Sequence, residues 1–355
     1  MKPFLKRVAR HYYDGGDIQK RCFIFPNRRS MIFFRKYLCE EVAASGKDPI
    51  VAPQMLSIND FFSRLSGMTT SGRIRLLVEL YECYCRLNPN AESLDEFIFW
   101  GDVLLGDFND VDKYLVDPQQ LFCNISEYKD LQDDYTYLTQ TQKDAINAFI
   151  KHFKDDSGKL TVNIDTGDAD VKGRFLMIWN LLLPLYTEFG KVLKAKDMAY
   201  EGMMYRSLVE KFSAEDAAQV LRTAFPREES FVFVGLNALN ECEKAVLRKL
   251  RNASLAEFCW DWSGSMIKDG KNRSSFFMTE NVREFPQAFR LDDEGVGMTS
   301  FNSLSVPSSY GQVKHLAPIL EQLDYKDDAL GSSSNTAVVI PDETLLMPLL
   351  NSVPE

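Results

Sequence analysis

The sequence has no cysteine framework and few histidines. Its 355 residues include 7 cysteines and 3 histidines. No Cys-x-x-Cys pair occurs and the cysteine number is odd, so the sequence suggests neither a disulfide framework nor a zinc site. His11, His152 and His315 lie far apart, and no Ser-His-Asp or Cys-His arrangement can be proposed. These absences predict a protein of a reducing compartment.

Long apolar runs are absent as well. The most apolar segment, Phe175–Tyr186, is too short to cross a bilayer and is interrupted by Asn180 and Pro184. Residues 1–13 mix basic and apolar side chains without the continuous apolar core of a signal peptide. We therefore expect a cytoplasmic location and no membrane partner.

Positive charge is scarce overall, because 41 Lys and Arg face 51 Asp and Glu, for a net charge of −10. A surface that attracts nucleic acid over its whole extent is therefore not expected. Residues 1–36 are the exception, since only Asp14 and Asp17 oppose many basic residues there. Any contact with a polyanion has to be local.

The motifs of an ATP-hydrolysing motor are missing too. Each Gly-Lys pair lacks the following Ser or Thr and the upstream glycine of a phosphate-binding loop. Gly235 and Leu236 follow the apolar run Phe231–Val234, where a magnesium-binding acid would stand. Asp342 follows another apolar run, but we expect it to cap a helix. No ATP, metal or other cofactor is predicted.

Some carboxylates have the spacing of metal sites but the wrong context. Asp117 and Glu127 match a two-carboxylate nuclease pattern within helical sequence, and Asp165 and Asp170 match it within a polar loop. Asp107–Asp112 resembles the start of a calcium loop but lacks its glycine, so we expect a solvated helix face. No catalytic residue is predicted.

What is present is an α/β pattern. Short apolar runs at Cys22–Phe25, Phe231–Val234 and Ala256–Trp260 predict buried strands, and helical periodicity fills most of the sequence between the first two. We expect one sheet, split by a helical insertion. The expected helices of the insertion are Arg73–Leu87, Leu94–Leu115, Pro118–Ile125, Thr141–Phe153, Arg174–Ala195 and Tyr200–Phe212, with a loop or hairpin at Lys154–Gly173.

Further elements are predicted near the two ends of the sequence. Met1–Tyr13 has helical spacing, and Ser57 is a predicted helix cap after an extended piece at residues 49–56. Near the end of the chain, strands at Ser300–Val306 and Ala337–Ile340 alternate with helices at residues 312–323 and 343–350. Two strands cannot make a stable independent sheet, so we expect the chain to be a piece of a longer protein.

The most informative stretch is Lys20–Leu38, which predicts a strand, a tight turn and a helix. In an open α/β sheet, ligands bind at the loops that leave the carboxyl ends of strands. Here that loop carries Asn27, Arg28 and Arg29, whose donors suit phosphate or a nucleic-acid backbone, and Arg35 and Lys36 add to the local charge. The alternative is a solvated basic turn.

The order of these segments resembles the amino-terminal part of an AddB-type subunit, of the PD-(D/E)XK helicase-nuclease family related to RecB, RecC and UvrD-like helicases. The resemblance is carried by Phe25–Arg29 with Phe33–Leu38, Ser57–Phe62, the helical region with Trp100–Leu105, Asp107–Asp112 and Tyr200–Met203, Phe233–Leu239 with Glu243, Trp260–Trp262, Tyr310–Leu323 and Thr336–Ile340. Residues 25–38 are similar to the family's second helicase motif, which contacts single-stranded DNA. Phe233–Leu239 corresponds to its Walker B region.

The resemblance implies a P-loop-NTPase-like, UvrD-type parallel sheet domain with a large all-helical insertion and the start of a second α/β domain. Residues 1–70 and 213–291 would form a degenerate first motor domain, residues 71–212 the insertion, and residues 298–355 the truncated start of the second motor domain. The chain begins where the Walker A strand would already have passed, and Gly235-Leu236 replaces the acidic pair. ATP hydrolysis is therefore expected to be lost.

The implied function is that of an ATPase-dead, helicase-like module in bacterial double-strand-break repair and recombination. Its partners would be single-stranded DNA or duplex ends and an AddA-like or RecB-like motor subunit. The magnesium-dependent nuclease domain of the family would lie downstream of Glu355. The alternative is a non-catalytic scaffold that binds proteins through the helical insertion and does not bind DNA.

Overall fold

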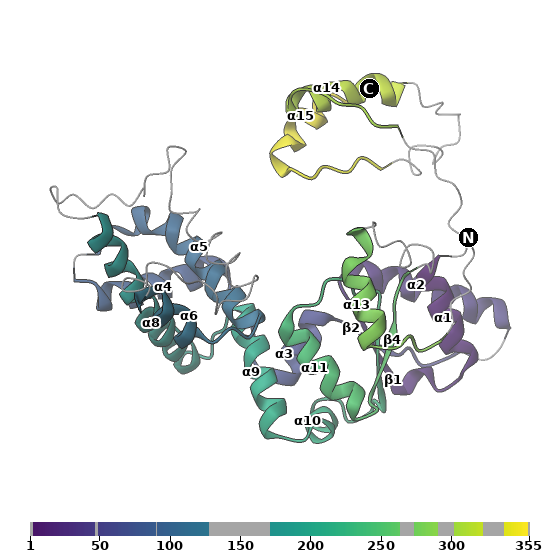
Figure 1. The fold of residues 1–355 in the computed structure, drawn as a ribbon. Helices are drawn as coiled ribbons and strands as arrows, with labels where there is room; N and C mark the ends of the chain where they lie inside the picture. The colour runs from purple at the N-terminus through teal and green to yellow at the C-terminus, as the bar shows by residue number, and fades with distance from the viewer. Residues whose placement is uncertain are drawn as a thin grey trace. The chain divides into compact units, whose positions relative to one another are not determined.

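The computed structural model describes residues 3–46, 49–89, 91–127, 171–262, 273–289, 302–321 and 337–353, except the side chains of residues 123–127 and 171–180. The chain divides into two compact units, Met1–Gly295 and Val296–Glu355 (Figure 1). Each unit is described by itself, and the first contains the sheet and the candidate site.

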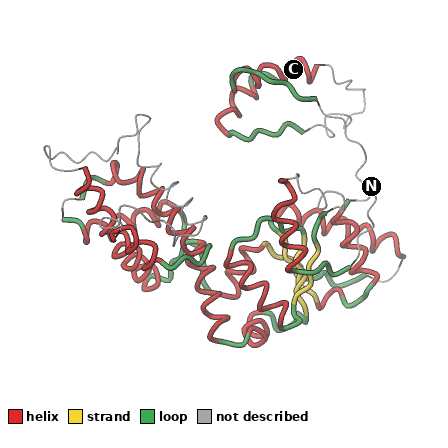
Figure 2. The backbone as a smooth tube through the Cα atoms, viewed as in Figure 1, coloured by secondary structure: helices red, strands yellow, loops and turns green. Residues whose placement is uncertain are grey.

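A four-stranded, all-parallel sheet forms the centre of the first unit, in the order β2-β1-β3-β4 (Figure 2). The strands are β1 (Arg21–Phe25), β2 (Gln54–Ser57), β3 (Ser230–Val234) and β4 (Ala256–Cys259). β1 pairs with β3 in the register Arg21↔Ser230. The α/β class and the predicted strands of this sheet are confirmed.

Side chains alternate between the two faces of the sheet, and each face is covered by helices. The 3₁₀ turn η1 (Ile18–Lys20), α1 (Phe4–Asp14) and α2 (Arg28–Ser45) bury one face against Phe23, Phe25, Val232 and Val234. The helices α3 (Ile58–Ser66), α10 (Ala217–Ala224) and α11 (Glu241–Asn252) bury the other face against Cys22, Ile24, Phe231 and Phe233. A sheet covered on both faces explains the continuous apolar runs of β1 and β3.

The two central strands, β1 and β3, are followed in the chain by strands on opposite sides of the sheet. From β1, the crossover through α2 leads outward to β2, whereas from β3 the crossover through α11 leads outward to β4 on the opposite side. The two crossover helices lie on opposite faces, as crossovers of one hand require when they run in opposite directions. The carboxyl ends of β1 and β3 therefore flank a topological switch point, which is where open α/β sheets bind ligands.

A helical region separates β2 and α3 from β3 in the chain. Its described helices are α4 (Arg73–Leu87), α5 (Leu94–Lys113), α6 (Pro118–Glu127), α8 (Val171–Ala195) and α9 (Glu201–Ala214). These agree with the predicted helices within a few residues. The predicted loop Lys154–Gly173 is wrong over its described end, because α8 already begins at Val171. The predicted helix Thr141–Phe153 and residues 154–170 lie outside the described residues.

Asp112 corrects the prediction of a solvated face at residues 107–112. Its carboxylate is 1% exposed and accepts hydrogen bonds of 2.5 Å from both Tyr186 and Tyr200, while Arg206 Nε lies 2.7 Å from Oδ1. Burial raises the pKa of Asp112, and these hydrogen bonds and the charge of Arg206 oppose that rise. Its backbone carbonyl also accepts from Cys242 Sγ of α11 at 3.2 Å. Asp112 therefore joins the helical region to a crossover helix of the sheet.

The second unit contains helices but, among its described residues, no strand. It has α14 (Ser309–Glu321), the 3₁₀ turn η4 (Glu343–Leu345) and α15 (Leu346–Leu350). The strands predicted at residues 300–306 and 337–340 are wrong over their described parts, which have no regular structure. An extended segment becomes a strand only when a neighbour pairs with its backbone. Asp342 caps η4 as predicted, accepting from Thr344 N at 2.9 Å.

Candidate nucleic-acid interface

The loop after β1 is short because Asn27 starts the next helix directly. Asn27 is the N-cap of α2, and its Oδ1 accepts hydrogen bonds from Ser30 N at 3.0 Å and Ser30 Oγ at 3.2 Å. Pro26 precedes it and cannot donate a ladder hydrogen bond. The sequence predicts Asn27 as a ligand donor, whereas its side-chain oxygen caps the helix.

Arg28 and Arg29 form the first turn of α2, and both are exposed. This first turn contains no acidic residue. In the part of the chain that the structure describes, neither guanidinium takes part in an ion pair. The positive end of the helix dipole adds to these two charges. The turn therefore offers exposed cations at the carboxyl end of β1, beside the switch point.

Arg35 and Lys36 lie two turns further along α2 and are also exposed. The nearest described acid along this face is Glu40. Its pKa is lowered first by a hydrogen bond from Lys6 and more weakly by the charge of Lys36. The structure thus brings all four predicted basic side chains onto the solvent-exposed amino-terminal half of one helix.

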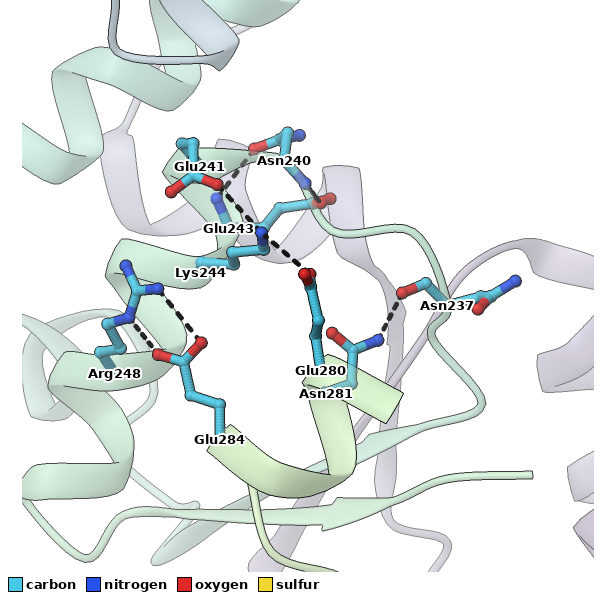
Figure 3. Close-up of polar contacts among 9 residues, drawn as sticks. All are labelled: Asn237, Asn240, Glu241, Glu243, Lys244, Arg248, Glu280, Asn281 and Glu284. Atoms are coloured by element: carbon cyan, nitrogen blue, oxygen red, sulfur yellow. Dashed lines mark hydrogen bonds and ion pairs between the residues drawn. The ribbon is translucent and has the colours of Figure 1, made fainter. Parts of the chain in front are cut away.

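The turn after β3 forms the other side of the switch point (Figure 3). Gly235 has φ +68°, a conformation that side chains disfavour, and a Cβ there would meet the ring of Phe4 at 3.4 Å. Asn240 then caps α11, and its Oδ1 accepts from Glu243 N at 2.9 Å. Glu243 Oε2 in turn accepts from Asn240 N at 2.9 Å, which completes a capping box. The sequence predicts this helix over Ala238–Leu250, and the capping box starts it about one turn later, at Glu241.

Glu243 is the carboxylate that corresponds to the Walker B region in the resemblance. It is 8% exposed, and burial raises its pKa to about 7. One of its oxygens accepts a hydrogen bond from the backbone nitrogen of Asn240, the N-cap of its own helix. This arrangement stabilises the start of α11 and turns the carboxylate away from the role of a solvent-facing metal ligand.

The helix α13 (Phe276–Glu284), preceded by the 3₁₀ turn η2 (Arg273–Ser275), holds this turn from outside. Asn281 is 2% exposed and donates from Nδ2 to the carbonyl of Asn237 at 2.5 Å (Figure 3). Arg248 pairs with Glu284 through two nitrogens, and Lys244 Nζ lies 3.9 Å from Glu280. No local sequence signal predicts this contact, because α13 is far from the turn in the sequence.

A polar cleft lies where α3, α4, α5 and α9 meet, with a volume of about 490 Å³. Three of its charged side chains are already engaged: Arg73 with Asp102, Glu201 with Lys113, and Asp60 with the Ser57 hydroxyl. The other lining residues are Asn59, Ser63, Thr69, Thr70, Ser71, Leu76, Leu105, Gly106, Asn109, Tyr200 and Met204. The cleft offers hydroxyl and amide groups but few free charges, so it suits a polyanion less well than α2 does.

Among the described residues, no group of three or more His, Cys, Asp or Glu side chains could hold a metal ion. No helix within those same residues is long and apolar enough to cross a membrane. The cysteines at 22, 39, 83, 85, 242 and 259 are free thiols.

Comparison with known proteins assigns no relative. No protein-family model matches the chain, and no curated protein matches it.

Proposed function

We propose that this chain is the helicase-like part of an AddB-type helicase-nuclease subunit. In this proposal it binds single-stranded DNA, including the strand exposed at a duplex end, and a motor subunit of the AddA or RecB kind. It hydrolyses no ATP itself and serves double-strand-break repair. The P-loop-type, UvrD-like identity of the sheet domain is part of the same proposal.

The observation that carries the proposal is the exposed basic half of α2 at the switch point. Arg28, Arg29, Arg35 and Lys36 are exposed without described ion pairs, in a chain with a net charge of −10. Exposed cations outside described ion pairs are available to phosphates, and arginine binds phosphate oxygens through two parallel donors. The interaction is local because the rest of the molecule repels polyanions.

The arrangement of the elements supports the same family. A parallel sheet is interrupted between β2 and β3 by a large helical region, in the order that the resemblance implies. At the end of β3, Gly235 and Leu236 stand in place of an acidic pair, and Glu243 is engaged in its capping box. These features favour a nucleotide-independent role.

The second candidate function is a protein scaffold. The observation that favours it is an exposure of large apolar side chains on the helical region, where Ile74 of α4 is 78% exposed and Phe99 of α5 is 79% exposed. A contiguous patch of exposed apolar side chains marks a protein contact, and α4 and α5, which carry these two side chains, pack against each other. The two candidates differ in whether the arginines of α2 take part in binding.

The deciding experiment titrates a fluorescently labelled single-stranded oligonucleotide with the whole chain over a range of salt concentrations. The test variant is Arg28→Ala/Arg29→Ala. The matched control is Arg222→Ala/Arg227→Ala, which removes two exposed arginines near the amino end of β3, at the opposite edge of the sheet. Both variants lose the same charge, so only the position of the charge differs.

We expect weak binding that falls with salt, with a slope of about −0.7 for each phosphate contact. The test variant should lower the magnitude of that slope by roughly one to two units, whereas the control should leave the slope unchanged. Equal slopes for the wild type and both variants, or no binding at low salt, would favour the scaffold.

A further inference from the structure

Two large apolar side chains stand exposed among the cations of α2. Ile32 is 57% exposed and Phe33 is 43% exposed. On a helix, residues three or four positions apart are surface neighbours. Phe33 therefore has Arg29 one turn before it and Lys36 one turn after it, and Ile32 has Arg28 and Arg35 in the same relation. Apolar and basic side chains alternate along one exposed stripe about 12 Å long.

Phe33 and Phe34 are adjacent in the chain but differ in burial. The ring of Phe34 is fully buried, with centroids 4.8 Å from Phe23 and 5.1 Å from Phe25 of the sheet. The ring of Phe33 instead lies 6.4 Å from that of Tyr37, which is half-buried against the same core. Lys6 Nζ lies 5.9 Å from the Tyr37 centroid. Phe33 thus lies beside Tyr37 and leaves less than half of its surface open to solvent.

This alternation matches the chemistry of a single nucleic-acid strand. Proteins that bind single strands combine cations that follow the phosphates with aromatic rings on which bases stack. A duplex keeps its base faces covered. The four charges of the stripe are all positive, and residues 28–39 contain no acid, so the stripe complements a row of phosphates along one strand. The stripe therefore offers cations for the phosphates and an aromatic ring for a base of the same strand.

We infer that Phe33 is a base-stacking residue, and that a single nucleic-acid strand lies along the exposed face of α2. Arg28, Arg29, Arg35 and Lys36 hold its phosphates while a base stacks on Phe33. The inference rests on the proposed function and extends it from the phosphates to the bases. Every base presents a flat face, so this contact tolerates any sequence.

The test compares two labelled oligonucleotides of one length, oligo-dT and an abasic strand with the same phosphates, on the whole chain at low salt. The test variant is Phe33→Leu. The matched control is Phe99→Leu, the same substitution at another exposed phenylalanine, on α5. A third variant, Phe33→Trp, keeps a stacking ring and adds a fluorescent reporter.

The wild type should bind oligo-dT about five- to tenfold more tightly than the abasic strand, at the lower end of the range for one stacked base. Phe33→Leu should abolish this preference and leave the affinity for the abasic strand and its salt slope unchanged. Phe99→Leu should behave as the wild type. Phe33→Trp should keep the preference, and oligo-dT but not the abasic strand should quench its fluorescence.

The outcomes separate the inference from the proposed function. If neither strand binds, the proposed function fails and the inference fails with it. If the wild type binds both strands equally, or Phe33→Leu keeps the preference for oligo-dT, the inference fails while phosphate binding stands. If Phe33→Leu weakens both strands by the same factor, Phe33 only positions the arginines, and the inference is again overturned.

Discussion

Asn240 and Glu243 hold each other at the start of α11, each side chain accepting a hydrogen bond of 2.9 Å from the backbone nitrogen of the other. Glu243 is the buried carboxylate of the region that resembles a Walker B motif, two residues after Glu241. In this capping box the Glu243 carboxylate stabilises the start of a helix, a structural role that needs no nucleotide.

Glu243 should make the stability of the protein depend on pH. Burial raises its pKa in the folded protein to about 7, above the 4.5 of a free glutamate. Between these values the folded protein binds the proton that the unfolded chain has lost, so this group lowers stability as pH rises and its full cost is present above about pH 7. Glu243→Gln, which keeps a capping oxygen, should gain about 1 to 3 kcal/mol relative to the wild type between pH 5 and pH 8. Urea unfolding of both proteins at the two pH values measures this, and parallel pH profiles would contradict it.

Removing the carboxylate of Asp112 should destabilise the helical region strongly. Asp112→Ala leaves the guanidinium of Arg206, only 20% exposed, without its acid and the hydroxyls of Tyr186 and Tyr200 without their acceptor. Losing one partner of a buried ion pair costs about 3 to 5 kcal/mol. The control Asp110→Ala, at an exposed position of the same helix, should change stability by less than about 0.5 kcal/mol. Similar urea midpoints for the two variants would show that the Asp112 network contributes little.

Gly202 should not tolerate a side chain, because α9 and α5 approach closely there. An added Cβ would lie 2.2 Å from the backbone oxygen of Asn109. The Gly202 nitrogen also donates to Asn109 Oδ1 at 2.8 Å, so separating the helices would lengthen this bond. We expect Gly202→Ala to destabilise by about 1 to 3 kcal/mol, the range for overpacked cores.

Gly190 of α8 is the matched control for that substitution. A Cβ there meets nothing within 4 Å, so Gly190→Ala should stabilise the helix by about 0.4 to 1 kcal/mol through the unfolded chain. Thermal unfolding of both variants measures the contrast. A stable Gly202→Ala protein would mean that α5 and α9 can move apart at little cost.

We expect no productive binding of magnesium-ATP by these residues. The sequence has no glycine cradle with its lysine, and Gly235 and Leu236 follow β3 where an acidic pair would bind magnesium. The β- and γ-phosphates and their metal would therefore lose most of their usual contacts. Isothermal calorimetry and an ATPase assay test this. Low-micromolar affinity or measurable turnover would overturn it and reopen the possibility of an active motor.

The local sequence determined where most elements begin and end. Apolar spacing predicted α4 over Arg73–Leu87 without error, and Ser57 caps α3 as predicted, accepting from Asp60 N at 3.2 Å. The local sequence also predicted that Arg28 and Arg29 lie in the turn that follows a buried strand. Such predictions succeed because caps and periodicity depend on residues within about one helical turn.

Only the tertiary structure decided what those elements meet. β1 and β3 pair across the whole helical region, and their pairing puts the arginines of α2 at the switch point. Asp112 was expected in solvent, but side chains from α8 and α9 meet and bury it. Residues 337–340 have the composition of a strand and no described partner. The physical reason is the same in all three cases. A local pattern of apolar or acidic residues indicates the environment that a side chain prefers, but its partner comes from a distant part of the chain that only folding brings near.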